Sequence, residues 1–126
     1  MKQLMWIVIL LFAVTFGAVA QDVVMMEAHA ISVDSGKWVL CEPVIKIALL
    51  ESKIKIFSER YQEYTCISVI GKGDGETEVS TTWLCLDKYG TNVWVTLGKL
   101  TTDDYGVYLL VKYSDHAWMY RGYLKD

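Results

Sequence analysis

The sequence predicts an all-β domain built as an antiparallel up-and-down meander. Three features of the second half of the chain favour this class: short stretches rich in Val, Thr and aromatic residues, a period of two along them, and turn residues between them. Each short turn reverses the chain, which makes neighbouring strands antiparallel. No alternation of strands with helices is present, so a parallel sheet is not expected.

The N-terminus has the pattern of a secretory signal peptide. Lys2 gives a positive start, residues 6–14 form an almost unbroken apolar run, and Ala18-Val19-Ala20 is typical of a cleavage site. Residues 1–20 are therefore expected to be removed, which leaves residues 21–126 as a single domain of a secreted, extracellular protein.

The first half of the mature chain has weaker patterns. Residues 21–35 show no clean period and are interpreted as an irregular lead-in, followed by a short first strand at 38–40. Residues 44–51 fit a helix or a strand, whereas alternation from Ile54 onward favours a strand, and Pro43 fits a turn.

The second half predicts five strands with short turns between them. The glycine-rich stretch at 71–75 is the strongest turn signal, because glycine permits positive φ. The expected strands are residues 64–70, 78–86, 92–97, 105–113 and 117–124.

Charge and composition exclude several classes of function. The net charge is −3 and no basic run occurs, so binding of nucleic acid or anionic lipid is not expected. No catalytic constellation is found, and two histidines with three cysteines do not suggest a zinc site, so neither an enzyme nor a cofactor is predicted. In an oxidising compartment Cys41, Cys66 and Cys85 should give one disulfide and one free thiol. The sequence does not decide which of the three possible pairs forms the disulfide.

Three motifs in this order resemble the signature of the lipocalins. They are Gly36-Lys37-Trp38, Asp104-Tyr105-x-x-Tyr108 and Arg121; Asp103 stands where lipocalins carry Thr. The resemblance implies a small lipocalin-like β-barrel, with a reduced or partly open barrel as the alternative. It gives Trp38, Asp104 and Arg121 structural roles: Trp38 closes the barrel floor, Arg121 stacks on it, and Asp104 sets the start of a strand.

The resemblance also implies secreted binding or transport of a small hydrophobic ligand inside the barrel. It places one face of the last two strands on the cavity and turns Leu110, Trp118 and Tyr120 outward. Tyr113 is expected to add a hydrogen bond to the ligand. The predicted lining residues are Leu109, Val111, Tyr113, Ala117 and Met119, together with Val93 and Val95.

Two alternatives remain open from the residues. Asp104-x-Gly106-x-Tyr108 also matches an immunoglobulin-like motif, although Leu110 stands where that motif has its cysteine. The other is a secreted interaction module without a pocket, which would use outward aromatics such as Trp118, Tyr120 and Trp94, or form a homodimer through them or through the odd cysteine. A filled barrel interior would favour such a module.

Overall fold

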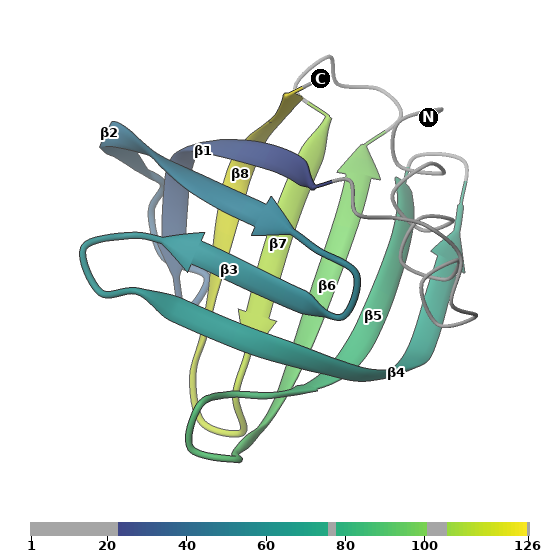
Figure 1. The fold of residues 1–126 in the computed structure, drawn as a ribbon. Helices are drawn as coiled ribbons and strands as arrows, with labels where there is room; N and C mark the ends of the chain where they lie inside the picture. The colour runs from purple at the N-terminus through teal and green to yellow at the C-terminus, as the bar shows by residue number, and fades with distance from the viewer. Residues whose placement is uncertain (1–22, 76–77, 101–105, 126) are drawn as a thin grey trace.

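The chain forms a closed antiparallel barrel in which every strand pairs with its neighbours in sequence and the last pairs with the first (Figure 1). The computed structural model describes residues 23–75, 78–100 and 106–125, so the predicted signal peptide and Asp104 lie outside the described residues. The strands are β1 (Val24–Val33), β2 (Val39–Leu49), β3 (Lys53–Phe57), β4 (Gln62–Asp74), β5 (Glu78–Leu86), β6 (Asn92–Leu100), β7 (Val107–Lys112) and β8 (Ala117–Lys125).

The all-β up-and-down prediction is confirmed, and the alternatives of a reduced or open barrel are wrong. Strand order follows the sequence around the whole barrel, from β1 to β8 and back to β1. An immunoglobulin-like domain would instead need two packed sheets with Greek-key connections. That alternative is therefore wrong as well.

The predicted irregular lead-in at 21–35 is also wrong, because most of it is strand β1. Met26 and Ala28 both point inward and are 0% exposed. The register with β2 and β8 then shifts between Ala28 and Ala30, which marks a β-bulge at His29. A bulge adds one residue to a strand and reverses its inward–outward alternation. This shift explains why the sequence shows no clean period there.

Trp38 lies in the connection between β1 and β2 rather than in the first strand, where it was predicted. Its side chain is 45% exposed, and closure of the barrel floor by Trp38 stays a prediction. The strand expected at 38–40 is the beginning of the longer β2, and the helical alternative for 44–51 is wrong because these residues pair with β1 and β3. Stacking of Arg121 on Trp38 stays a prediction.

The barrel closes because β8 can approach β1 very closely at Gly122. A Cβ atom at this position would collide with the backbone carbonyl oxygen of Glu27. The backbone of Ala28, which pairs with Gly122, would also be in the way. Only glycine fits such a close approach of two strands.

Apolar side chains fill the barrel interior. Val93 and Val95 of β6 and Leu109 and Val111 of β7 are all 0% exposed, so no space large enough for a water molecule adjoins them. They belong to one buried cluster that draws side chains from all the strands. Its other members are Met26, Ala28, Ile47, Leu49, Ile54, Ile56, Tyr64, Trp83, Cys85, Leu97, Val107 and Tyr120.

The predicted inward and outward faces of β8 are reversed. Val111 pairs with Trp118, and Leu109 pairs with Tyr120. Residues directly opposite each other in an antiparallel pair point to the same side of the sheet. Trp118 and Tyr120 therefore face inward with Leu109 and Val111, and Tyr120 is only 1% exposed.

Ala117 and Met119 consequently lie on the outer face of the barrel, opposite Lys112 and Leu110. The turn sets this register. Only Ser114 and Asp115 separate Tyr113 from His116, and the N–H of Tyr113 donates a 2.8 Å hydrogen bond to the carbonyl of His116. In a hairpin of this kind, turn length decides which residues share a face.

Candidate functional site

A pocket of about 560 Å³ opens at one end of the barrel. It lies between the β3–β4 connection, the β5–β6 turn and the β7–β8 turn, and the last two meet at the bottom of the view in Figure 1. Aromatic and charged side chains make up most of its wall. The lining residues are Arg60, Tyr61, Gln62, Glu63, Tyr64, Asp87, Lys88, Tyr89, Tyr113, His116 and Trp118.

Three rings of the β7–β8 hairpin lie nearly parallel to one another in the pocket wall. The ring centroids of Tyr113 and His116 are 4.8 Å apart with an interplanar angle of 6°. Trp118 lies 5.6 Å from each of them, at 25° to Tyr113 and 19° to His116. Offset stacking at such distances is favourable for aromatic pairs. The two-residue turn brings the three rings together, because it places Tyr113 and His116 opposite each other.

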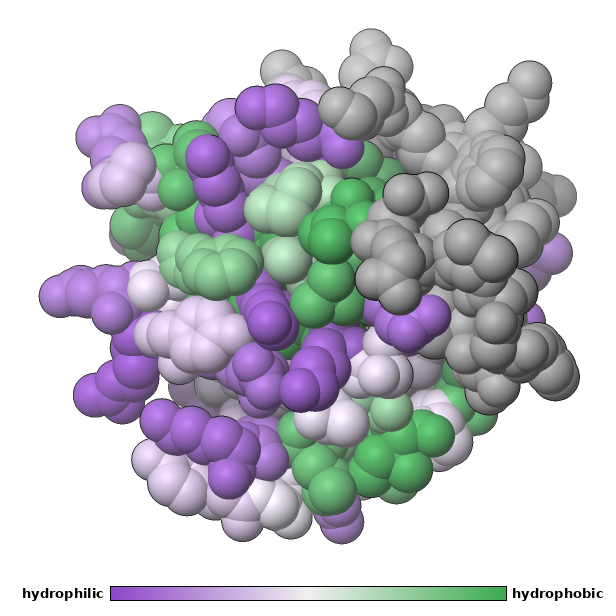
Figure 2. Space-filling model, in the orientation of Figure 1, coloured by the Kyte–Doolittle hydropathy of each residue, from purple (hydrophilic) through white to green (hydrophobic). Residues whose placement is uncertain are grey.

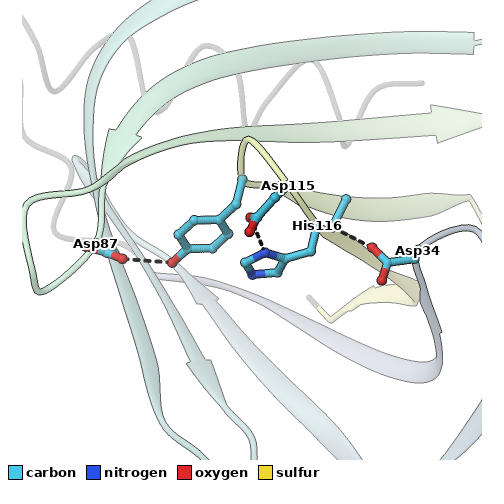
Figure 3. A network of polar contacts seen from close by, with 6 residues as sticks. Asp34, Asp87, Asp115 and His116 are labelled. Atoms are coloured by element: carbon cyan, nitrogen blue, oxygen red, sulfur yellow. Dashed lines mark hydrogen bonds and ion pairs between the residues drawn. The ribbon is translucent and has the colours of Figure 1, made fainter.

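Asp87 ties this aromatic wall to the β5–β6 turn. The hydroxyl of Tyr113 donates to Oδ2 of Asp87 over 2.9 Å (Figure 3). The backbone N–H groups of Tyr89 and Thr91 both donate to Oδ1 over 2.9 Å. Desolvation alone would raise the pKa of Asp87. Hydrogen bonds from Thr91, Tyr113 and Tyr89 outweigh it, so the pKa lies below the ordinary value of 3.8.

A chain of hydrogen bonds links the pocket wall to the core. Tyr64 donates from its hydroxyl to Oε1 of Gln62 over 2.6 Å, and Nε2 of Gln62 donates to the hydroxyl oxygen of Tyr120 over 3.0 Å. Burial raises the pKa of both tyrosines above the ordinary value of 10, which keeps them neutral. Gln62 and Tyr64 thus bring polar groups to the pocket wall.

The β7–β8 turn is anchored to the neighbouring β1–β2 connection. Oδ1 of Asp34 accepts a 2.9 Å hydrogen bond from the backbone N–H of Ala117 (Figure 3). The N–H of Asp34 donates to the carbonyl of Ala117 over 2.7 Å. Within the turn, Asp115 lies 2.6 Å from Nδ1 of His116, and this contact lowers the pKa of the Asp115 carboxyl. The aromatic wall is therefore held from both sides.

Charges of both signs surround the opening. Arg60 and Lys88 bring positive charge, and Lys88 lies 5.1 Å from the ring centroid of Tyr89. Glu63 brings negative charge and accepts a 2.8 Å hydrogen bond from the hydroxyl of Tyr61. Such a balanced rim does not select strongly for a charged ligand.

The indole nitrogen Nε1 of Trp118 is buried, although its ring lines the pocket. The Trp118 side chain interacts with the hydroxyl of Tyr120, so the aromatic wall is in contact with the core beneath it.

Of the predicted lining residues, only Tyr113 lies in this pocket. Val93, Val95, Leu109 and Val111 are packed in the core beneath it, and Ala117 and Met119 face outward. The sequence interpretation missed a group of pocket residues that come from turns and strand ends. They are Tyr64, Asp87, His116 and Trp118. Polar and aromatic residues flanking the predicted turns at 87–90 and 114–115 were the available signal.

A second hollow, of about 500 Å³, lies on the outside of the barrel beside the bulge of β1. Its lining comes from His29 and Ala30 of β1 and from Arg121, Gly122 and Tyr123 of β8. The rings of His29 and Tyr123 meet edge to face, with centroids 5.3 Å apart. It has less aromatic surface than the pocket at the barrel mouth, which is therefore the better candidate site.

The described residues contain no cluster of three or more His, Cys, Asp or Glu side chains suited to a metal ion. Nor does any helix within the described ranges have the length and apolar character needed to cross a membrane. Fold and site together define a small up-and-down β-barrel with an aromatic pocket at one mouth. Comparison with protein-family models, curated proteins and solved structures finds no match for the chain.

Proposed function

We propose that this chain is a secreted binding protein that carries a small hydrophobic ligand with a flat ring at the mouth of its barrel. The observation that carries the proposal is the set of three nearly parallel rings, Tyr113, His116 and Trp118, in the wall of a pocket of about 560 Å³. Pockets of this size suit small organic molecules. Secretion is proposed from the signal-peptide pattern of residues 1–20.

The proposed ligand lies at the mouth rather than deep in the barrel. The side chains beneath the mouth are fully buried against one another, as Leu109 and Val111 illustrate. A flat apolar ring placed against the aromatic wall would gain roughly 25 cal/mol for each Å² of apolar surface removed from water. Stacking on the existing rings would add about 0.5–1.5 kcal/mol.

Polar groups of the pocket would orient the ligand. Gln62 and Asp87 already hold Tyr64, Tyr113 and Tyr120 in fixed positions through hydrogen bonds. Fixed rings lose little conformational entropy when a ligand binds, which favours affinity. The rim of the opening carries charges of both signs. It therefore suits a ligand whose outer end is polar and whose inner end is apolar.

The test is native mass spectrometry of the secreted, non-reduced protein, followed by extraction with organic solvent. We expect a hydrophobic molecule with ring absorbance, in near-stoichiometric amount. A fluorescent probe, 1-anilinonaphthalene-8-sulfonate, should bind folded protein that has been freed of its ligand. The molecule recovered by the extraction should displace this probe. Protein that carries no molecule and does not bind the probe would overturn the proposal.

Two tryptophan variants locate the site. Trp118→Leu should abolish or strongly weaken probe binding, because Trp118 lines the pocket. Trp94→Leu is the matched control: Trp94 is 38% exposed and alternates with the inward Val93 and Val95, so it lies on the outer face. Equal binding by both variants would place the probe elsewhere on the barrel.

A second candidate function is a secreted interaction module without a bound small molecule. It is favoured by the filled interior and by four exposed apolar residues around the β1–β2 connection: Val33, Trp38, Val39 and Leu40 are 56%, 45%, 60% and 72% exposed. Figure 2 shows a further apolar patch at the lower right of the view. On β4, Ile67 and Ile70 are also 54% and 50% exposed. An empty protein that dimerises in solution would favour this function.

A further inference from the structure

Cys66 and Cys85 lie directly opposite each other on the neighbouring strands β4 and β5. Their Sγ atoms are 3.6 Å apart, with the thiol of Cys85 donating to the sulfur of Cys66. The third cysteine, Cys41, lies on β2, and β2 pairs with β1 and β3 rather than with β4 or β5. The fold thus selects one pair among three that the sequence leaves open.

The positions satisfy the geometric requirements of a disulfide. Directly opposite residues of an antiparallel pair have Cα atoms about 4.5–5.5 Å apart, within the range of about 4.4–6.8 Å seen in disulfides. Closing the sulfur–sulfur distance from 3.6 Å to a covalent bond of about 2.05 Å needs side-chain rotation rather than movement of a strand.

We propose that Cys66 and Cys85 form an intramolecular disulfide that fixes β4 to β5 beneath the pocket. Tyr64 precedes Cys66 by two residues and Asp87 follows Cys85 by two, and both line the pocket. The disulfide would therefore hold together the two strands that position these pocket residues. It is independent of the proposed ligand, because it rests on the strand register and on the distance between the two sulfur atoms.

The reaction is thiol–disulfide exchange with a small disulfide such as glutathione disulfide. The Cys66 thiolate attacks one sulfur of the oxidant, forms a mixed disulfide and releases one glutathione. The Cys85 thiolate then attacks the Cys66 sulfur and releases the second glutathione. The two thiol protons end on the two released glutathione thiolates. The two cysteines are oxidised by two electrons in total, and the glutathione disulfide is reduced by the same two.

The partly exposed Cys66 is the expected site of the first attack, because Cys85 is 0% exposed. The hydrogen bond to Cys66 and burial both raise the pKa of the Cys85 thiol, which slows its own reaction with an external oxidant. In the second step the attacking sulfur is already in contact with its target.

Peptide mapping of the full-length protein from a secretory host tests the pairing. The non-reduced protein is denatured, alkylated with iodoacetamide and digested with trypsin. Cleavage after Lys and Arg puts the three cysteines on three different peptides, residues 38–46, 61–72 and 73–88. We expect peptide 61–72 joined to 73–88, and the label on Cys41 alone. Labels on all three cysteines, or a disulfide that contains Cys41, would overturn the proposal.

Thermal unfolding gives a second readout. Adding dithiothreitol should lower the Tm of the wild type and of Cys41→Ser by roughly 10 °C, because both lose a disulfide that closes a loop of about 20 residues. Cys66→Ser should show no such shift, since it has no disulfide to lose. A reductant-sensitive Tm in Cys66→Ser, or an insensitive one in Cys41→Ser, would contradict the pairing. If a serine variant fails to fold, the peptide map of the wild type still decides.

Discussion

The hydroxyl of Tyr113 donates a 2.9 Å hydrogen bond to Oδ2 of Asp87, although the two residues lie 26 positions apart in the sequence. This bond joins the end of β7 to the β5–β6 turn. It holds the ring of Tyr113 parallel to His116 in the pocket wall. One side chain thus links the polar network of the barrel mouth to its aromatic surface.

Removing only this hydroxyl should weaken the barrel modestly. Tyr113→Phe keeps the ring but deletes the donor to Asp87, so the free energy of unfolding should fall by about 1 kcal/mol. Urea unfolding followed by circular dichroism measures the change. Tyr61→Phe is the control, because the bond from Tyr61 to Glu63 lies at an exposed site and should contribute less. A larger loss in Tyr61→Phe would contradict the assigned role of Tyr113.

Acid should destabilise the protein partly through Asp87. Its pKa is lower in the folded state than the ordinary 3.8, so the folded state binds fewer protons. The stabilisation is present above pH 3.8 and is lost as the pH falls through the folded pKa. Asp87→Asn should therefore show a shallower decrease in the free energy of unfolding below that pH. An unchanged acid dependence in this variant would show that Asp87 is not responsible.

Two adjacent leucines test the assignment of the inner and outer faces. Leu109 is 0% exposed inside the barrel, whereas Leu110 is half-buried on the outer face. Leu109→Ala should cost about 2–5 kcal/mol of unfolding free energy, because it leaves a cavity in the core. Leu110→Ala makes the same chemical change and should cost clearly less. Similar losses in chemical denaturation would mean that the faces of β7 are misassigned.

Barrel closure can be tested at one glycine. In Gly122→Ala the new Cβ would collide with the carbonyl of Glu27, and backbone has little room to yield. We expect a loss of at least about 3 kcal/mol, at or beyond the upper end of typical overpacking costs, or failure to fold. Gly71→Ala is the control, since its nearest neighbour would be the Cβ of Thr82 at an ordinary 3.9 Å. Comparable melting temperatures for both variants would contradict the close contact between β1 and β8.

Local patterns in the second half of the sequence identified its strands, but the turn predicted at 71–75 is wrong, because β4 continues to Asp74 and pairs with β5 there. The alternation of Val93, Val95 and Leu97 identifies β6 and its inner face, because strand periodicity is a property of neighbouring residues. The same reasoning failed for β1, where the bulge at His29 reverses the alternation. It also failed for the faces of β8, whose register depends on the exact length of the turn at Ser114-Asp115.

The candidate site was less predictable than the fold. Tyr113 was named as a ligand contact from the sequence, but its partner Asp87 was not, and the other predicted contacts lie in the core or on the outer face. A pocket at the mouth of a barrel is assembled from turns that are distant in sequence. No local pattern tells which of their side chains will meet.

The sequence by itself determined the all-β class, the antiparallel meander and most strands of the second half, because these depend on periodicity and turn residues within short segments. Only the tertiary structure decided that β1 closes the barrel against β8, that Trp118 faces inward, and that Cys66 meets Cys85. Each of these facts depends on strand register. Register is set jointly by bulges, turn lengths and the packing of the whole core, which a one-dimensional pattern does not contain.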